Sequence, residues 1–258
     1  MTDWNPNLYR RFEGERTRPA MDLLARVALD EPKRVVDLGC GPGNSTELLT
    51  VRYPNAGVTG IDTSPAMVEA ARKRLPNASF EVGDAATWTS TSPFDIVYSN
   101  AVFHWVPDHA ALMPRLAKLV APGGFLAFQV PDNRAEPTHT SMSTAARAIG
   151  KHDIVEAAEA ERAVIGSFED YWKWLSPHAD HIDLWQTTYV HPLEGHDAVV
   201  SWFESTGLRP YLARLDADET RAFKAAYRKE IANAYSLVEG RVLLRFLRLF
   251  VVARMRCS

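Results

Sequence analysis

Three glycines stand close together in the stretch Val35-Val36-Asp37-Leu38-Gly39-Cys40-Gly41-Pro42-Gly43-Asn44, which opens with apolar residues. Glycine tolerates positive φ and lets a ligand approach the backbone, so the stretch predicts a ligand-binding turn between a strand and a helix. The spacing is GxGxG and not the GxGxxG of dinucleotide-binding loops. A carboxylate at Asp37 can face a cation, which favours a positively charged ligand without phosphate. A tight turn that binds nothing is the alternative.

Two further acids follow the next two apolar runs. Asp62 lies about 20 residues beyond the glycine loop, where nucleotide-binding α/β folds place a carboxylate that accepts both ribose hydroxyls. Asp84 could accept from an adenine amino group, and the Ala85 amide could reach the ring. Taken singly, each acid is weak evidence for a nucleoside site, since strands often end in Asp and Asp84 could cap a helix. Together, three acids at three strand ends predict a nucleoside site, and S-adenosylmethionine, with its sulfonium, amino group and adenosine, fits them.

The elements that must position these residues alternate between strands and helices in the first half of the chain. Short apolar runs predict strands over residues 34–39, 57–61, 80–82, 94–99 and 125–130, the last one after a turn at Pro122-Gly123-Gly124. Helical spacing covers residues 23–29, 44–52, 64–75, with Ser64 as cap and Pro65 at the first position, and 108–119. This alternation predicts a parallel sheet covered on both faces.

After Pro131 the alternation stops. Residues 138–171 are rich in Ala, Glu and His without a clear strand, and helices are expected over 197–206 and 218–233. Strands are expected over 182–189 and 247–254, the last β-branched in character. We therefore expect one α/β domain over residues 1–258, with an N-terminal lid segment at 1–30 and a helical cap from about 134–178 and 195–240.

Composition indicates an ordinary globular protein and excludes several classes. The net charge of -3 argues against a surface that neutralises many phosphates. From Ser201 onward there are 11 Lys and Arg against 6 Asp and Glu, which indicates either an anion pocket or solvated helix faces. Two cysteines, Cys40 and Cys257, make neither a disulfide framework nor a metal site. No apolar run suits a signal peptide or a membrane span, so we expect a cytoplasmic protein.

The glycine stretch Asp37–Gly43, the acids Asp62 and Asp84, and Ser99-Asn100 at the fourth strand end together resemble the class I S-adenosylmethionine-dependent methyltransferases. The resemblance covers roughly the first half of the chain. It implies a Rossmann-like, seven-stranded sheet with its last strand antiparallel. It also implies that Asp62 holds the ribose, that Asp84 and Ala85 hold the adenine, and that Gly39 and Asn100 hold the methionine end.

A narrower resemblance, to the trans-aconitate 2-methyltransferase family, extends over nearly the full length. That family makes a monomethyl ester of a tricarboxylate and releases S-adenosylhomocysteine. The matching segments are Asp3-Trp4-Asn5-Pro6, Tyr9, Glu15-Arg16, Arg18-Pro19, Pro131-Asp132-Asn133, Glu136-Pro137-Thr138-His139, Thr206-Gly207-Leu208-Arg209-Pro210 and Arg248-Leu249-Phe250.

Methyl transfer to a carboxylate would require positioning and no catalytic acid or base. A carboxyl group with a pKa near ~4 is ionised at neutral pH, so the acceptor needs no general base. The nucleophile, the methyl group and the leaving sulfur must lie in line, within about 3 to 3.5 Å for the attack. Transfer to an amine or hydroxyl would need a base more often, and His104 would be the candidate.

A buried tricarboxylate requires cations with fork geometry. The candidates for acceptor binding are Tyr9, Arg16, Arg18, His104, His139, Arg209 and Arg248. Each arginine could equally be a surface cation packed by its aliphatic stem, and His104 could be a half-exposed helix residue. Trp105 could pack in the core or wall the pocket.

Three other functions stay open. The chain could methylate another small acid, a phenol or an amine; it could be a non-catalytic S-adenosylmethionine-binding protein; or it could be a nicotinamide-dependent dehydrogenase, whose GxGxxG loop is absent. Nucleic acid is not an expected partner, because there is no Asn-Pro-Pro-Tyr motif and no basic block interleaved with aromatics. We expect no metal, no membrane association, and a monomer or homodimer.

Overall fold

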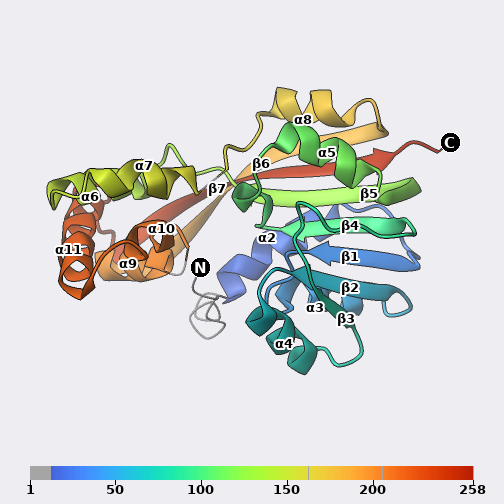
Figure 1. Ribbon diagram of the computed structural model, residues 1–258, viewed down its shortest axis with the longest axis horizontal. Coiled ribbons are helices and arrows are strands. Elements are labelled where there is room, and N and C mark those ends of the chain that lie inside the picture. Colours follow the sequence, from blue (N-terminus) through green and yellow to red (C-terminus); the bar gives the residue numbers. More distant parts are fainter. Residues whose placement is uncertain (1–12, 162, 205, 258) are drawn as a thin grey trace. The chain divides into compact units, whose positions relative to one another are not determined.

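The computed structural model describes residues 13–161, 163–204 and 206–257. Within them, seven strands form one sheet in the order β3-β2-β1-β4-β5-β7-β6. The strands are β1 (Arg34–Leu38), β2 (Gly57–Asp62), β3 (Ser79–Val82), β4 (Phe94–Asn100), β5 (Val120–Pro131), β6 (Ala179–Glu194) and β7 (Arg241–Met255). The pairs among β1 to β5 are parallel, whereas the arrow of β7 points against those of β1 and β4 (Figure 1). The expected sheet, with its last strand antiparallel, is confirmed.

Helices lie before, between and after the parallel strands, and local sequence explains where they begin. They are α2 (Glu13–Ala25), α3 (Asn44–Arg52), α4 (Pro65–Arg74), the short 3₁₀ helix η1 (Phe103–Trp105), α5 (His109–Ala117) and α8 (Phe168–Leu175). The predicted cap of α4 is confirmed: the Ser64 hydroxyl accepts a hydrogen bond from the Met67 amide at 3.2 Å, and Pro65 occupies the first turn.

The central strands are buried on both faces, as parallel strands between helices must be. Val36, Leu38, Val97 and Phe128 belong to an apolar cluster with Leu112 and Leu116 of α5 and with Tyr171 and Leu175 of α8. Side chains alternate along a strand, so Tyr98, next to Val97, faces the other way. Its hydroxyl donates to the Ala20 carbonyl of α2 at 2.6 Å, which places α2 on the opposite face.

Two predicted boundaries are wrong. The helix expected over residues 23–29 is the end of α2, which stops at Ala25. The turn expected at Pro122-Gly123-Gly124 lies inside β5, which already pairs with β4 at Val120. Phe94 faces Val120 and Ile96 faces Phe125, so the extra residues of β5 form an irregularity in the register. Gly123 permits this bulge because its φ is +74°. Proline and glycine here distort a strand and do not end it.

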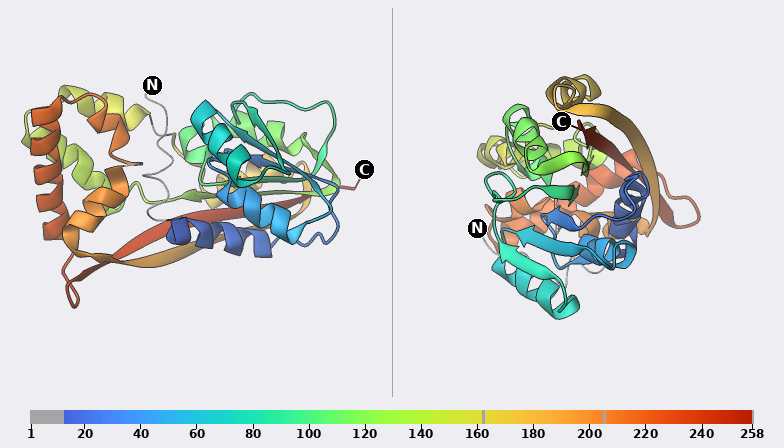
Figure 2. Two further views of the ribbon diagram at one scale, coloured as in Figure 1. Left: turned by 90° about the horizontal axis from the view of Figure 1, so that it is seen from below. Right: turned by 90° about the vertical axis from the view of Figure 1, so that its right-hand side faces the viewer.

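The chain divides into two compact units. Unit 1 contains residues up to Val130, Ala163–Gln186 and the chain from Leu249 onward; unit 2 contains Pro131–Arg162 and Thr187–Arg248. The strands β6 and β7 lie side by side and each contributes residues to both units (Figures 1 and 2). The roles of lid for residues 1–30 and of cap for 134–178 and 195–240 stay predictions.

Unit 2 is largely helical. Its helices are α6 (Pro137–Ala148), α7 (Asp153–Ala160), α9 (Gly195–Glu204), α10 (Arg209–Leu212) and α11 (Ala217–Ala234). α11 buries Phe223, Tyr227 and Ile231, which lie four residues apart on one helix face. The Tyr227 hydroxyl donates to the Thr138 carbonyl at 2.8 Å and so ties α11 to the first turn of α6.

Candidate functional site

The glycine loop after β1 has the backbone conformation that the sequence predicts. Gly39 has a φ of +75°, and a Cβ atom there would lie 2.1 Å from Cγ2 of Val102. Gly41 has a φ of +55°, but a Cβ atom there would meet no atom of the described residues within 4 Å. Gly39 is therefore required by packing, whereas Gly41 borders open space in which a ligand can approach the backbone.

Asp62, at the end of β2, holds this loop. One carboxylate oxygen accepts from the Gly41 amide at 2.9 Å, and the other accepts from the Ser64 amide at 2.9 Å. The carboxylate thus joins the glycine loop to the start of α4. An ionised carboxylate has about four acceptor positions, and these two amides donate to two of them in the half-buried Asp62.

Asp37 lies in β1 and is fully buried. Its Oδ2 atom accepts from the hydroxyls of Ser45 and Thr46, both at 2.7 Å, while Oδ1 has no hydrogen-bond partner among the described residues. Burial raises the pKa of Asp37 from 3.8 to about 6; the two hydroxyl donors oppose this shift, and the nearby charge of Asp62 adds to it. Asn44, the first residue of α3, also has a buried side-chain oxygen without a partner in the described structure.

The third and fourth strand ends supply Asp84 and Asn100. Asp84 is exposed, and its carboxylate accepts from the Ala86 amide at 2.8 Å. A turn and no helix follows it, so the helix-cap alternative is wrong; Ala85 beside it is buried. The Asn100 side-chain oxygen accepts from the Gln129 amide group. Because β3, β2, β1 and β4 are neighbours, these residues meet at one sheet edge, here called the strand-end site.

The segment after Asn100 contains His104 within η1. Ala101 has a φ of +58°. His104 is buried, and the centroid of its ring lies 4.9 Å from that of the Trp105 ring. The His104 carbonyl accepts from the Ala163 amide at 3.1 Å. The buried position differs from the half-exposed helix residue that the sequence left open. Trp105 is half-buried, so its role stays a prediction.

A buried pair that the sequence did not indicate fixes this segment. His109 Nε2 lies 2.8 Å from the Phe103 carbonyl, and Nδ1 lies 2.7 Å from the Tyr171 hydroxyl. The carbonyl can only accept, so Nε2 carries the proton and Nδ1 accepts from Tyr171. Burial lowers the pKa of His109, which keeps the ring neutral. The pairing links positions 62 residues apart, so no local pattern could reveal it.

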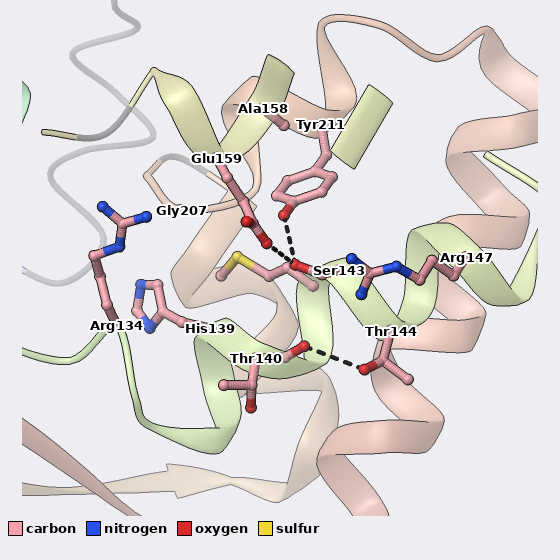
Figure 3. Close-up of a pocket in the computed structure, with 11 residues that line it drawn as sticks. Arg134, His139, Thr140, Ser143, Thr144, Arg147, Ala158, Glu159, Gly207 and Tyr211 are labelled. Carbon is pink, nitrogen blue, oxygen red and sulfur yellow. Dashed lines mark hydrogen bonds between the residues drawn. The ribbon is translucent and has the colours of Figure 1, made fainter. Parts of the chain in front are cut away.

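Unit 2 contains a pocket of about 420 Å³, here called the helical pocket. Figure 3 shows the side chains that line it, which come from the loop before α6, from α6 and α7, from the Gly207 turn and from α10. They are Arg134, His139, Thr140, Met142, Ser143, Thr144, Arg147, Ala158, Glu159, Gly207 and Tyr211. Two arginines and one glutamate give it a mixed but mainly cationic lining.

The predicted acceptor residues are spread over the chain. His139 lines the helical pocket, and its ring packs against that of Phe203 in a T-shaped arrangement with the ring centroids 5.2 Å apart. Arg209 begins α10 and is half-buried outside that lining. Arg248 is buried in β7 over the ring of Phe246, and Arg18 is exposed on α2. Tyr9 and the side chain of Arg16 lie outside the described residues.

Of the eleven lining residues only His139 was predicted to bind the acceptor; those not predicted include Arg134, Ser143, Arg147 and Glu159. Arg134 follows the Pro131-Asp132-Asn133 segment directly, which is the one signal that could have indicated it. The others stand on helices whose pocket-facing side is set by packing. In the described ranges, no three His, Cys, Asp or Glu side chains cluster to hold a metal ion, and no helix there is long and apolar enough to cross a membrane.

A methyltransferase domain model matches residues 12–194 of the chain. A trans-aconitate 2-methyltransferase from Methylobacterium nodulans is 52% identical over 98% of this chain and 99% of its own length. Proteins of the same name from Variovorax paradoxus and Yersinia pestis are 49% and 46% identical, over 98% of this chain and 99% and 98% of their own lengths.

Solved structures show the same fold at low identity. The YcgJ protein from Bacillus subtilis superposes with a TM-score of 0.61 at 13% identity, over 93% of this chain and 100% of its own. A phosphoethanolamine N-methyltransferase from Haemonchus contortus in complex with S-adenosylmethionine gives a TM-score of 0.55 at 14% identity. The superposition covers 93% of this chain and 53% of that protein.

Proposed function

The chain belongs to the S-adenosylmethionine-dependent methyltransferases and, within them, to the trans-aconitate 2-methyltransferase family, and from this premise we propose its substrates and its site. We propose that it transfers a methyl group from S-adenosylmethionine to a carboxylate of trans-aconitate. The products are the monomethyl ester and S-adenosylhomocysteine. The acceptor rests on the full-length similarity to relatives that carry this name.

The observation that carries the donor assignment is the Asp62 bridge. Its carboxylate orders the glycine loop through the Gly41 amide and stands at the end of β2, the position from which nucleotide-binding α/β folds hold the ribose hydroxyls. The open space beside Gly41 suits a ligand that approaches the backbone closely. A carboxylate with two ordered amide donors is pre-organised, because its position does not depend on the ligand.

The remaining donor contacts follow the strand ends. Asp84 and the Ala85 amide are proposed to receive the adenine, and Gly39, Asn44 and Asn100 the methionine end. Asp37 supplies negative charge beneath the loop, toward the donor's amino and sulfonium groups. Its hydroxyl bonds to Ser45 and Thr46 also fix the start of α3, so it acts at least partly through the loop that it supports.

Bound S-adenosylmethionine supplies an electrophilic methyl group, and the protein's part is to position and desolvate. An ionised carboxylate acceptor needs no general base, so no catalytic acid or base is assigned. His104 is the base to consider if an amine or phenol proves to be the acceptor. Tyr9, Arg16, Arg18, His139, Arg209 and Arg248 stay proposed acceptor contacts. We also propose a cytoplasmic location, and leave a monomer or a homodimer as the expected states.

A transfer assay tests this function. Purified protein is incubated with methyl-labelled donor and, separately, trans-aconitate, citrate, a phenol and a primary amine. Label is expected in an alkali-labile ester with trans-aconitate, and an Asp62→Ala variant should lose most of it. Transfer to another acceptor but not to trans-aconitate would refute the acceptor. Tight binding of S-adenosylhomocysteine without any transfer would favour a non-catalytic binding protein.

A further inference from the structure

The helical pocket has the chemistry of a site for a small polycarboxylate. We propose that it binds carboxylate groups of the acceptor and that Arg134 and Arg147 are its recognition cations. This inference rests on the proposed function and adds residues to it. All lining residues lie in unit 2, so the pocket can be described without reference to unit 1.

Helix α6 supplies most of the polar lining. His139, Thr140, Ser143, Thr144 and Arg147 are spaced at positions one, two, five, six and nine of a helical stretch, which places them on one side. Ala145 and Ala146, between Thr144 and Arg147, are buried and take no part in the lining. Thr140, Thr144 and Arg147 are exposed, so the stripe faces solvent on the open side of the pocket, from which a polar ligand can enter.

The two arginines stand at opposite ends of this stripe. Figure 3 shows Arg134 and His139 on one side of Ser143 and the guanidinium of Arg147 on the other. Arg147 forms no ion pair with any described residue, whereas Arg214 nearby in unit 2 is paired with Glu161 at 2.7 Å. Guanidinium groups bind carboxylates in a two-pronged geometry, so two separated forks suit a ligand with two separated carboxylates.

The lining also carries one fixed negative charge, that of the exposed Glu159 on α7. Glu159 can only accept, so the Ser143 hydroxyl donates to it, and the Ser143 oxygen accepts from the Tyr211 hydroxyl at 3.1 Å. Burial raises the pKa of Tyr211, which keeps its proton in this chain of bonds at neutral pH. Glu159 is therefore held in place and repels anions, while the arginines attract them.

The pocket also has the right size. Its volume of about 420 Å³ lies in the range of small-molecule sites, about 300 to 1,000 Å³. Gly207 keeps this space open, because a Cβ atom there would lie 2.7 Å from Met142 Cε and 3.4 Å from His139 Nε2. A small acid with carboxylates at both ends can meet one arginine at each end.

Charge changes of opposite sign test the site. Trans-aconitate is titrated calorimetrically into the full-length protein saturated with S-adenosylhomocysteine, for the wild type, Arg147→Gln and Glu159→Gln. Arg147→Gln should weaken binding about 10- to 100-fold, the usual effect of losing a hydrogen-bonded charge. Glu159→Gln keeps an acceptor for Ser143 and should tighten binding several-fold, roughly as expected when a like charge is removed. Arg221→Gln, an exposed arginine of unit 2 paired with Asp218, is the matched control and should bind like the wild type.

The outcomes separate the pocket from the proposed function. If the wild type methylates trans-aconitate but Arg147→Gln and Glu159→Gln bind it as Arg221→Gln does, the pocket inference is wrong and the function stands. If both charge variants weaken binding, the effect is structural and the inference is also wrong. If the wild type transfers no methyl group to trans-aconitate, the function fails. In that case a titration with the saturated tricarboxylate tricarballylate decides: opposite shifts in the two variants would still support a polycarboxylate site.

Discussion

The strand-end site of unit 1 and the helical pocket of unit 2 are fixed by different means. In the first, carboxylates accept from backbone amides, as Asp62 does from Gly41 and Ser64. In the second, charged side chains project from α6, from α7 and from the loop before α6, and the Glu159–Ser143–Tyr211 bonds fix only Glu159 among them. A site whose carboxylates are bonded to backbone amides is rigid, and substitutions in it are expected to be poorly tolerated. A site made of long side chains tolerates substitution and can be retuned by charge.

The largest expected effect is at Gly39, where backbone and packing act together. Gly39→Ala combines a positive φ with a Cβ atom 2.1 Å from Val102, and overpacking and strain together should destabilise the fold by about 4 kcal/mol. Gly150→Ala is the control, since its φ is +78° and a Cβ atom there meets no atom within 4 Å in the described part of the chain. Urea unfolding should show a loss about twice as large or more at Gly39; equal losses would mean that Val102 simply moves aside.

The next effect depends on pH and concerns Asp37. Its pKa is raised to about 6 in the folded protein, whereas an aspartate in the unfolded chain has a pKa of 3.8. Between these two pH values the folded state therefore holds a proton that the unfolded state has lost. Stability therefore falls as pH rises through this window, by on the order of 3 kcal/mol in total, and the loss persists above it.

An Asp37→Asn variant tests that sign. Asn keeps the shape without the buried charge, so the variant should gain stability relative to the wild type as pH rises from 4 to 7. Urea unfolding at several pH values measures the difference between the two proteins, which cancels the titration of the other groups. A difference that stays constant with pH would show that Asp37 does not titrate in this range.

Asp62 is expected to have a smaller effect on stability but a selective effect on donor binding. Asp62→Ala removes a charged acceptor from two amides and from the proposed ribose contact, which should weaken S-adenosylhomocysteine binding by roughly 30-fold. Asp95→Ala is the matched control. Asp95 also accepts from two backbone amides, those of Lys33 and Arg34, but at the amino end of β1.

Calorimetry on both variants sharpens the comparison. Asp95→Ala should lose stability and keep wild-type affinity for S-adenosylhomocysteine. Similar losses of affinity in both variants would mean that donor binding responds to general loosening of unit 1, and the specific role of Asp62 would be withdrawn.

The smallest expected effect is in the helical pocket. Tyr211→Phe removes one hydroxyl bond to Ser143 and should cost about 1 kcal/mol of stability, with a few-fold change in trans-aconitate affinity. Tyr227→Phe removes a comparable buried hydroxyl, which donates to Thr138 and does not line the pocket. It should lower the melting temperature similarly and leave trans-aconitate affinity unchanged. If Tyr227→Phe alters acceptor affinity as much as Tyr211→Phe, the hydroxyl of Tyr211 has no selective role.

The same contrast explains what could be predicted from the sequence. The glycine loop, Asp62 and Asp84 were predictable because strand ends and loop glycines are local patterns, and the parallel sheet brings them to one edge. Asp37 was expected to face a cation; its bonds to Ser45 and Thr46 depend on how α3 begins.

Longer-range features were not predictable. The sequence Pro122-Gly123-Gly124 predicts a turn, because local sequence does not show that β4 pairs with β5 on both sides of the bulge. The helical pocket joins Ser143 to Tyr211, 68 residues away, through the packing of α6, α7 and α10. Arginines on such helices look like ordinary surface residues until the fold brings them together.

Hydrogen exchange with each ligand in turn tests most directly whether two regions serve two substrates. S-adenosylhomocysteine should slow exchange in peptides that contain Gly39–Asn44, Asp62–Ser64 and Asp84–Ala86 of unit 1. Trans-aconitate, added to that complex, should slow exchange in peptides that cover Arg134–Arg147 and Glu159 of unit 2. Protection by S-adenosylhomocysteine only outside the three strand-end segments, or protection by trans-aconitate confined to unit 1, would contradict the division of work between the two sites.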